Sequence, residues 1–100
     1  MNSNTIQTLI KIENQQLAYS IIKAANTYYY NVRMECHTLY NGTMAQLSAH
    51  REDAHSHWAE LFNLLVNAHD LTENQQMTIL QDIRDYARKE WDNVRKIYQS

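Results

Sequence analysis

Apolar residues recur at intervals of three and four along three segments of the chain, the spacing that places side chains on one face of a helix. The first segment carries Ile6, Leu9/Ile10, Leu17, Ile21, Ala24, Tyr28, Val32 and Leu39. The second carries Met44, Leu47, Arg51, Ala54, Trp58, Leu61, Leu65 and Ala68, and the third carries Met77, Leu80, Ile83, Ala87, Trp91, Val94 and Ile97/Tyr98. The pattern predicts helices over about 5–40, 43–69 and 73–98.

Residues that interrupt helices are rare in this chain, which has no proline and a single glycine, Gly42. Asn41-Gly42 is expected to end the first helix, with the glycine in the left-handed conformation. Residues 69–72 form the second corner, where Thr72 and Gln75 resemble a capping box. Short corners favour antiparallel neighbours. The predicted fold class is all-α: an up-down-up antiparallel three-helix bundle with a long first helix, in a single domain over residues 1–100.

The predicted helices differ in length. At about 1.5 Å per residue the first is roughly 54 Å long and each of the others about 40 Å. Residues 5–14 are therefore expected to overhang the bundle and to leave Ile6, Leu9 and Ile10 without neighbours in the same chain. The alternative is a bend near Asn14. It is supported by a repeat, because Glu-Asn-Gln-Gln occurs at 13–16 and again at 73–76, where it opens the third helix.

A second stripe on the first helix consists of Ile12, Tyr19, Ile22, Tyr29/Tyr30, Arg33, His37 and Tyr40. Consecutive helical residues point about 100° apart, so one narrow core seam cannot bury Tyr28, Tyr29 and Tyr30 together. Tyrosine and arginine around an aliphatic centre are typical of protein–protein interfaces. Three interpretations stay open: both stripes are core, the second stripe joins two copies of the chain, or it binds a foreign protein. The predicted partner-binding residues are Ile6, Leu9, Ile10, Tyr19, Ile22, Tyr29, Tyr30, Arg33, His37 and Tyr40.

Arg51 interrupts the apolar seam of the second helix, opposite Glu35 or Asn31. Its side chain either extends from the seam edge towards water or forms a buried pair with Glu35 that fixes the register of the hairpin. The residues predicted to be nearly buried are Trp58, Leu61, Leu65, Leu80, Ile83 and Trp91.

Composition and charge exclude several functions. Apolar residues make up 44% of the chain, near the globular average, so disorder is not expected. The net charge of −2 gives no electrostatic reason to bind DNA, RNA or an anionic membrane. The basic residues of the third helix alternate with acids, as in Asp85/Lys89 and Asp92/Lys96, which is typical of a solvated face. Without a signal peptide or an apolar run that could span a bilayer, a cytoplasmic protein is expected.

Histidines cluster in the second helix, where His50, Asp53 and His57 share one face and Glu52 and His55 form an E-x-x-H pair. A di-iron bundle needs two such pairs and two further glutamates, so solvated or capping histidines are expected and no metal or cofactor is predicted. Cys36, the only cysteine, has no partner for an internal disulfide. On a helix it diverges from His37, and no catalytic residue, enzymatic activity or small-molecule substrate is predicted.

The leading functional hypothesis is a non-enzymatic protein–protein interaction module that binds a partner protein, or itself as a homodimer, through the aromatic face of the first helix. An alternative is a small inhibitor encoded by a phage or mobile element that occludes a surface of a host defence or nucleic-acid-processing complex. That alternative rests on an analogy with short, Asn/Gln/Tyr-rich helical proteins. A third hypothesis is a histidine-based metal-binding bundle.

Overall fold

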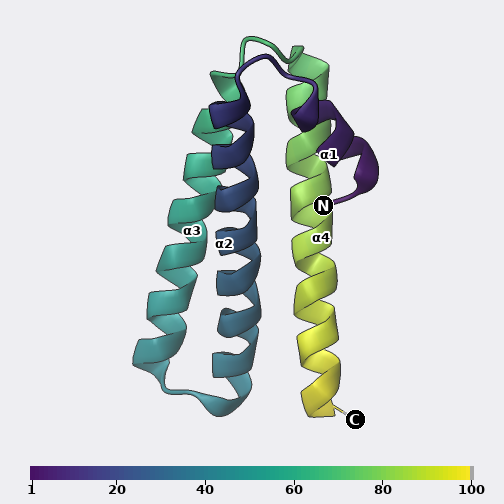
Figure 1. The fold of residues 1–100 in the computed structure, drawn as a ribbon. Helices are drawn as coiled ribbons and strands as arrows, with labels where there is room; N and C mark the ends of the chain where they lie inside the picture. The colour runs from purple at the N-terminus through teal and green to yellow at the C-terminus, as the bar shows by residue number, and fades with distance from the viewer. Residues whose placement is uncertain (100) are drawn as a thin grey trace.

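The computed structural model describes residues 1–99, which form four helices and no strand (Figure 1). They are α1 (Ser3–Ile10), α2 (Gln15–Asn41), α3 (Met44–Val66) and α4 (Glu73–Gln99). The three long helices, α2 to α4, alternate in direction (Figure 1). The all-α prediction is confirmed. The prediction of a three-helix bundle is not confirmed, because the segment predicted as one long helix forms two helices.

The break between α1 and α2 is held by side-chain hydrogen bonds to the backbone. Asn14 caps α2, its side-chain oxygen accepting from the backbone N–H of Leu17 at 3.1 Å. Asp70 Oδ2 accepts from the backbone N–H groups of Glu13 and Asn14 at 3.1 and 3.2 Å. The side-chain amide of Gln15 donates to the carbonyl of Ile12 at 2.6 Å. The alternative of a bend near Asn14 is therefore confirmed, and the prediction of an overhanging helix is wrong.

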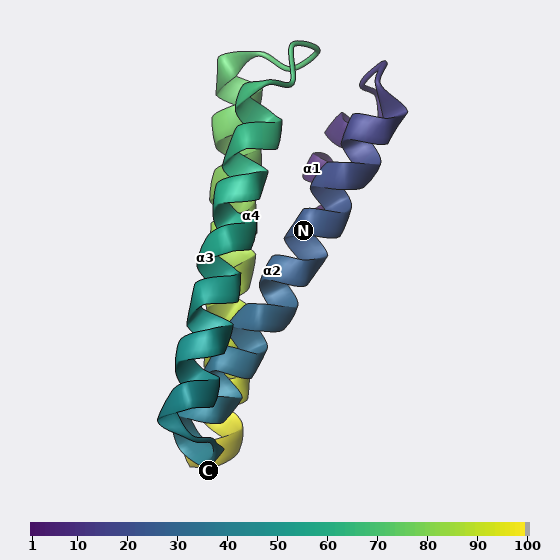
Figure 2. The same ribbon diagram turned by 90° about the vertical axis from the view of Figure 1, so that its left-hand side faces the viewer.

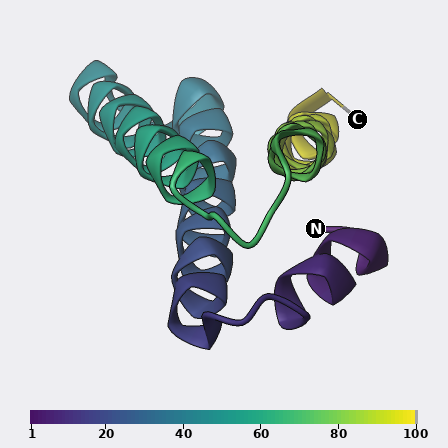
Figure 3. The ribbon, with the colours of Figure 1, turned by 90° about the horizontal axis from the view of Figure 1, so that it is seen from above.

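α1 turns back and lies beside α4, on the side away from α3 (Figure 3). The backbone N–H of Asn2 donates to Asp82 Oδ2 at 3.0 Å, and the side chains of Thr5 and Leu9 are buried. The expectation that Leu9 lacks neighbours in its own chain is wrong, because folding back removes its side chain from water. Ile6 and Ile10 remain exposed, at 39% and 59%.

The first corner lies where the sequence predicts it, between α2 and α3. Thr43 and Gln46 form a reciprocal capping box that begins α3. Gly42 has φ −125° and ψ −177°, an extended conformation, so the prediction of a left-handed glycine is wrong. A β-carbon on Gly42 would lie 2.8 Å from Cβ of Thr38. Glycine is required here by the close approach of the chain and not by a positive φ.

The second corner is longer than predicted, because α3 ends at Val66 instead of His69. The connecting residues Ala68 and Leu71 are buried, and the side-chain amide of Gln76 donates to the carbonyl of Ala68 at 3.1 Å. The buried connecting segment therefore takes the place of the predicted last turn of α3. The predicted capping box of Thr72 and Gln75 is confirmed, with hydrogen bonds of 2.9 and 3.1 Å.

The core lies between α2, α3 and α4, which occupy the corners of a triangle when seen along the bundle (Figure 3). α2 and α3 lie together near Gly42 and diverge towards their other ends (Figure 2). Four of the six predicted core residues are buried, namely Leu61, Leu65, Leu80 and Ile83. Trp58 and Trp91 are only half-buried, so the prediction is wrong for both. Within residues 1–99, none of the helices combines the length with the apolar character that crossing a bilayer requires.

Candidate functional site

The second stripe of the sequence begins at Ile12, which lies in the break before α2 and is buried. The rest of the stripe runs along α2 and divides between different environments. Its C-terminal part packs on α4. Arg33 forms an ion pair with Glu90 at 3.5 Å, and His37 Nδ1 lies 2.7 Å from the hydroxyl of Tyr98. The ring of Tyr40 stacks on that of Tyr98, with centroids 4.9 Å apart and planes 5° apart. These three predicted partner-binding residues therefore already have partners within the chain.

Tyr29 belongs to the core, and its ring is only 4% exposed. Its ring centroid lies 4.6 Å from that of Tyr86 on α4. Its hydroxyl is one of two buried side-chain polar atoms without a hydrogen-bond partner in the part of the chain that is described. Burial, reinforced by the charge of Asp82, raises the pKa of Tyr29 far above its ordinary value. Tyr29 and Leu9 are thus removed from the predicted binding surface, because both lie inside the protein.

Tyr19 and Tyr30, which belong to the part of the second stripe on the N-terminal half of α2, face outwards. Tyr19 is 67% exposed and Tyr30 51%, although both are large aromatic residues. Tyr19, Lys23, Asn26 and Tyr30 follow one another at helical intervals, so they form one continuous face of α2. With Ile22 and Thr27 they line an open groove of about 370 Å³. We call these six residues the outer face of α2.

The outer face combines aromatic rings, one positive charge and two uncharged hydrogen-bonding side chains. Lys23 is the only charged residue that lines the groove. The tyrosine rings present apolar area with a polar tip, and Asn26 and Thr27 add hydrogen-bonding groups. The residues that line this groove include no acid, histidine or cysteine.

The candidate metal ligands of the sequence lie on α3, where His50, Asp53, His55 and His57 are close together along the chain. Among residues 1–99, no three His, Cys, Asp or Glu side chains lie where they could together hold a metal ion. His57 Nδ1 pairs with Glu60 at 3.2 Å, and Nδ1 of His50 is buried without a hydrogen-bond partner among the described residues. Cys36 is buried, with Sγ 3.5 Å from the carbonyl oxygen of Trp91. Burial raises the pKa of the Cys36 thiol, which makes it a poor nucleophile.

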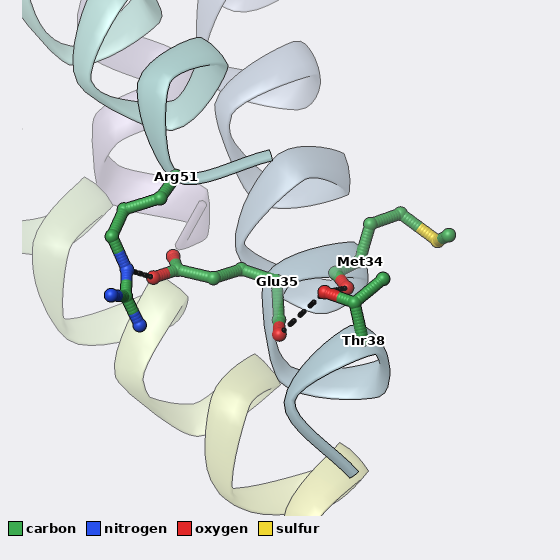
Figure 4. A network of polar contacts seen from close by, with 4 residues as sticks. All are labelled: Met34, Glu35, Thr38 and Arg51. Carbon is green, nitrogen blue, oxygen red and sulfur yellow. Dashed lines mark hydrogen bonds and ion pairs between the residues drawn. The ribbon is translucent and has the colours of Figure 1, made fainter. Parts of the chain in front are cut away.

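Arg51 extends from α3 to Glu35 on α2, and its Nε lies 2.7 Å from Oε1 of that carboxylate (Figure 4). The predicted pair is therefore present, but it is not buried: the Arg51 side chain is 53% exposed and that of Glu35 16%. The Thr38 hydroxyl donates to the carbonyl oxygens of Met34 and Glu35 one turn earlier. The pair joins the two helices near their shared turn, as expected for a contact that favours one register.

A second groove was missed by sequence reasoning, because three helices contribute to it. Its volume is about 380 Å³, and its lining comprises Tyr28, Val32, Glu35, Arg51, Ala54, His55, Trp58 and Arg84. The half-burial of Trp58 is explained by this opening, since one side of its ring lines the groove. A signal was present in the sequence, because Arg51 interrupts an apolar seam.

Comparison with models of protein families, with curated proteins and with solved structures gives no match to this chain.

Proposed function

We propose that this all-helical protein is a non-enzymatic interaction module that binds a partner protein through the outer face of α2. The observation that carries the proposal is the exposure of Tyr19 and Tyr30, at 67% and 51%, on one continuous helix face. Tyrosine is enriched at protein interfaces because it buries a large ring while its hydroxyl keeps a hydrogen bond. The neighbouring Ile22 supplies an aliphatic centre, and Lys23 and Asn26 supply a polar rim.

The composition of the outer face favours a protein over other ligands. A face with a single lysine lacks the dense positive charge that nucleic acids require. Its open, shallow shape on one helix does not enclose a small molecule, whereas protein interfaces are commonly flat. The partner is either a second copy of the chain or a foreign protein. An inhibitor that occludes a partner's surface would use the same residues.

The proposal is tested by capture with matched baits. The wild-type protein, Tyr19→Ala/Tyr30→Ala and the control Phe62→Ala/Val66→Ala are immobilised and exposed to an extract of the source organism. Phe62 and Val66 are each 48% exposed on α3, so the control removes a similar apolar surface elsewhere. A protein that wild type and control retain, and that the tyrosine variant loses at least tenfold, supports the proposal. Equal retention by all three baits contradicts it.

Self-association is measured separately, by sedimentation of the purified protein over a range of concentrations. If the partner is a second copy, the wild type forms dimers and Tyr19→Ala/Tyr30→Ala remains monomeric. A wild-type dimer that the tyrosine variant leaves intact would place the contact on another surface. Arg33 is not used in either test, because its ion pair with Glu90 makes it part of the bundle.

A further inference from the structure

The second groove lies between α3 and α4, with α2 as its floor. Tyr28, Val32 and Glu35 of α2 form the floor, and Arg51, Ala54, His55 and Trp58 of α3 form one wall. Arg84 of α4 lies on the opposite side. The view along the bundle shows the two wall helices on separate corners of the triangle (Figure 3). The groove is therefore the open seam of the bundle, the position at which a further helix would complete the packing.

The apolar part of this groove is aromatic. The rings of Tyr28 and Trp58 meet with centroids 5.3 Å apart and an interplanar angle of 42°. Val32 and Ala54 add aliphatic surface beside them. A half-buried tryptophan next to a tyrosine is the kind of site at which an apolar side chain of a partner contributes strongly to binding.

The charged part of the groove is positive. Arg51 uses Nε for Glu35, and its two terminal nitrogens point away from that carboxylate (Figure 4). Within residues 1–99, Arg84 forms no ion pair. Glu35 is the only acid in the lining, and it is already paired. Two guanidinium groups thus retain donors for a carboxylate beside an aromatic surface.

The helical repeat extends these faces beyond the groove itself. On α3, Arg51, His55, Trp58 and the exposed Phe62 follow at steps of four, three and four. On α4, Met77 and Trp91 lie seven residues before and after Arg84, so they share its face. An occupant that contacts both faces is elongated along the bundle. An amphipathic helix has this shape and buries an apolar stripe with charges on its flanks.

We propose that the groove between α3 and α4 binds an acidic amphipathic helix of a partner protein. Its apolar stripe packs on Tyr28 and Trp58, and carboxylates on its flanks accept from Arg51 and Arg84. A nucleic acid fits less well, because the protein carries a net charge of −2 and Glu35 lies in the groove floor. The surface is separate from the outer face of α2, since none of its lining residues belongs to that face.

The test uses a synthetic helical peptide of about 18 residues, roughly 27 Å long. Leucines form its apolar stripe and glutamates flank them, and a control peptide has glutamine for every glutamate. Calorimetry should show saturable one-to-one binding of the glutamate peptide. Arg84→Gln and the glutamine peptide should each weaken it roughly tenfold or more, because a hydrogen-bonded charge pair is lost. Lys89→Gln removes the same charge from another side of α4 and should leave the affinity within about twofold.

A second readout reports on the aromatic part of the groove. In Trp91→Phe, Trp58 is the only tryptophan left, because the chain has two, and its emission is excited at a wavelength that tyrosine does not absorb. The glutamate peptide should shift the emission of Trp58 to shorter wavelength, and at a peptide concentration near the wild-type Kd the shift should be much smaller in Arg84→Gln. Tyr19→Ala/Tyr30→Ala should bind the peptide normally, which separates this proposal from the one for α2.

Three outcomes overturn the proposal: no saturable binding of the glutamate peptide, equal affinity in Arg84→Gln and Lys89→Gln, or tighter binding of a single-stranded oligonucleotide than of the peptide. A fourth is a dimer of the protein alone that Arg84→Gln dissociates. In that case the occupant is a second copy of the chain and not a foreign helix.

Discussion

Tyr28, Tyr29 and Tyr30 follow one another in the chain and lie in three environments. Tyr28 is half-buried against Trp58, Tyr29 is enclosed by the core, and Tyr30 faces outwards. Helical geometry predicts that the three side chains diverge. Helical geometry does not show which tyrosine is buried, because the answer depends on which side of α2 is covered by α4. Tyr29 is the residue that α4 covers.

The buried hydroxyl of Tyr29 makes stability depend on alkaline pH. Its pKa is raised, so above about pH 10 the unfolded chain loses this proton while the folded chain keeps it. The unfolded state then binds fewer protons, and the free energy of unfolding falls as pH rises, by up to about 1.4 kcal/mol per pH unit. Urea denaturation between pH 9 and 11 should show that Tyr29→Phe loses less stability than the wild type.

At pH 7 the same substitution removes an unpaired buried hydroxyl, so it should raise the free energy of unfolding by about 1 kcal/mol. Tyr30→Phe is the matched control, because its ring is exposed and its hydroxyl is not enclosed. A loss of stability in Tyr29→Phe at pH 7 would show that the hydroxyl has a partner in solution.

At the scale of elements, the break between α1 and α2 shows what a local pattern can predict. The Glu-Asn-Gln-Gln repeat marks two helix starts, but in different registers: α2 begins at the third residue of the first copy and α4 at the first residue of the second. The capping residue is Asn14 in one case and Thr72 in the other. The bend is also held by Asp70, which is remote in sequence and accepts hydrogen bonds from the backbone of Glu13 and Asn14. The sequence could therefore suggest a bend as an alternative to the overhanging helix, but it could not show which of the two forms.

Asp70→Ala should detach α1. The substitution removes the acceptor for the backbone N–H groups of Glu13 and Asn14, and a lost pair of charge-assisted hydrogen bonds costs about 1–3 kcal/mol. Amide hydrogen exchange measured by NMR should accelerate in α1 and at residues 11–14, and should change little in α3. His69→Ala, at the exposed neighbouring position, should exchange like the wild type. Unchanged protection of α1 in Asp70→Ala would show that the turn is held by packing alone.

For the whole molecule, the lengths of the long helices account for its longest dimension. α2 and α4 each span 27 residues, about 40 Å, which agrees with the longest dimension of 43 Å. Periodicity predicts the three long helices and the core positions Leu61, Leu65, Leu80 and Ile83. It overestimates the burial of Trp58 and Trp91. Trp58 lines the groove between α3 and α4, which is a property of the assembled bundle. The two exposed surfaces likewise depend on which sides of α2 its neighbours cover.

Leu61 tests the packing of the bundle as a unit. Its side chain is fully buried, so Leu61→Ala should lower the free energy of unfolding by about 2–5 kcal/mol. Phe62→Ala, one residue further on and half exposed, should cost clearly less. The comparison is made by urea denaturation followed by circular dichroism. Equal costs for the two substitutions would mean that α3 presents a different face to the core.

We propose that a partner protein covers Tyr19 and Tyr30, which are exposed on the outer face of α2. Tyrosine footprinting by mass spectrometry tests it directly, in dilute purified protein and in an extract of the source organism. In the purified protein Tyr19 and Tyr30 should react rapidly and Tyr29 slowly. In the extract Tyr19 and Tyr30 should become protected at least severalfold relative to Tyr86, which is 37% exposed on α4. Equal reactivity of Tyr19 and Tyr30 in buffer and in extract would contradict the account.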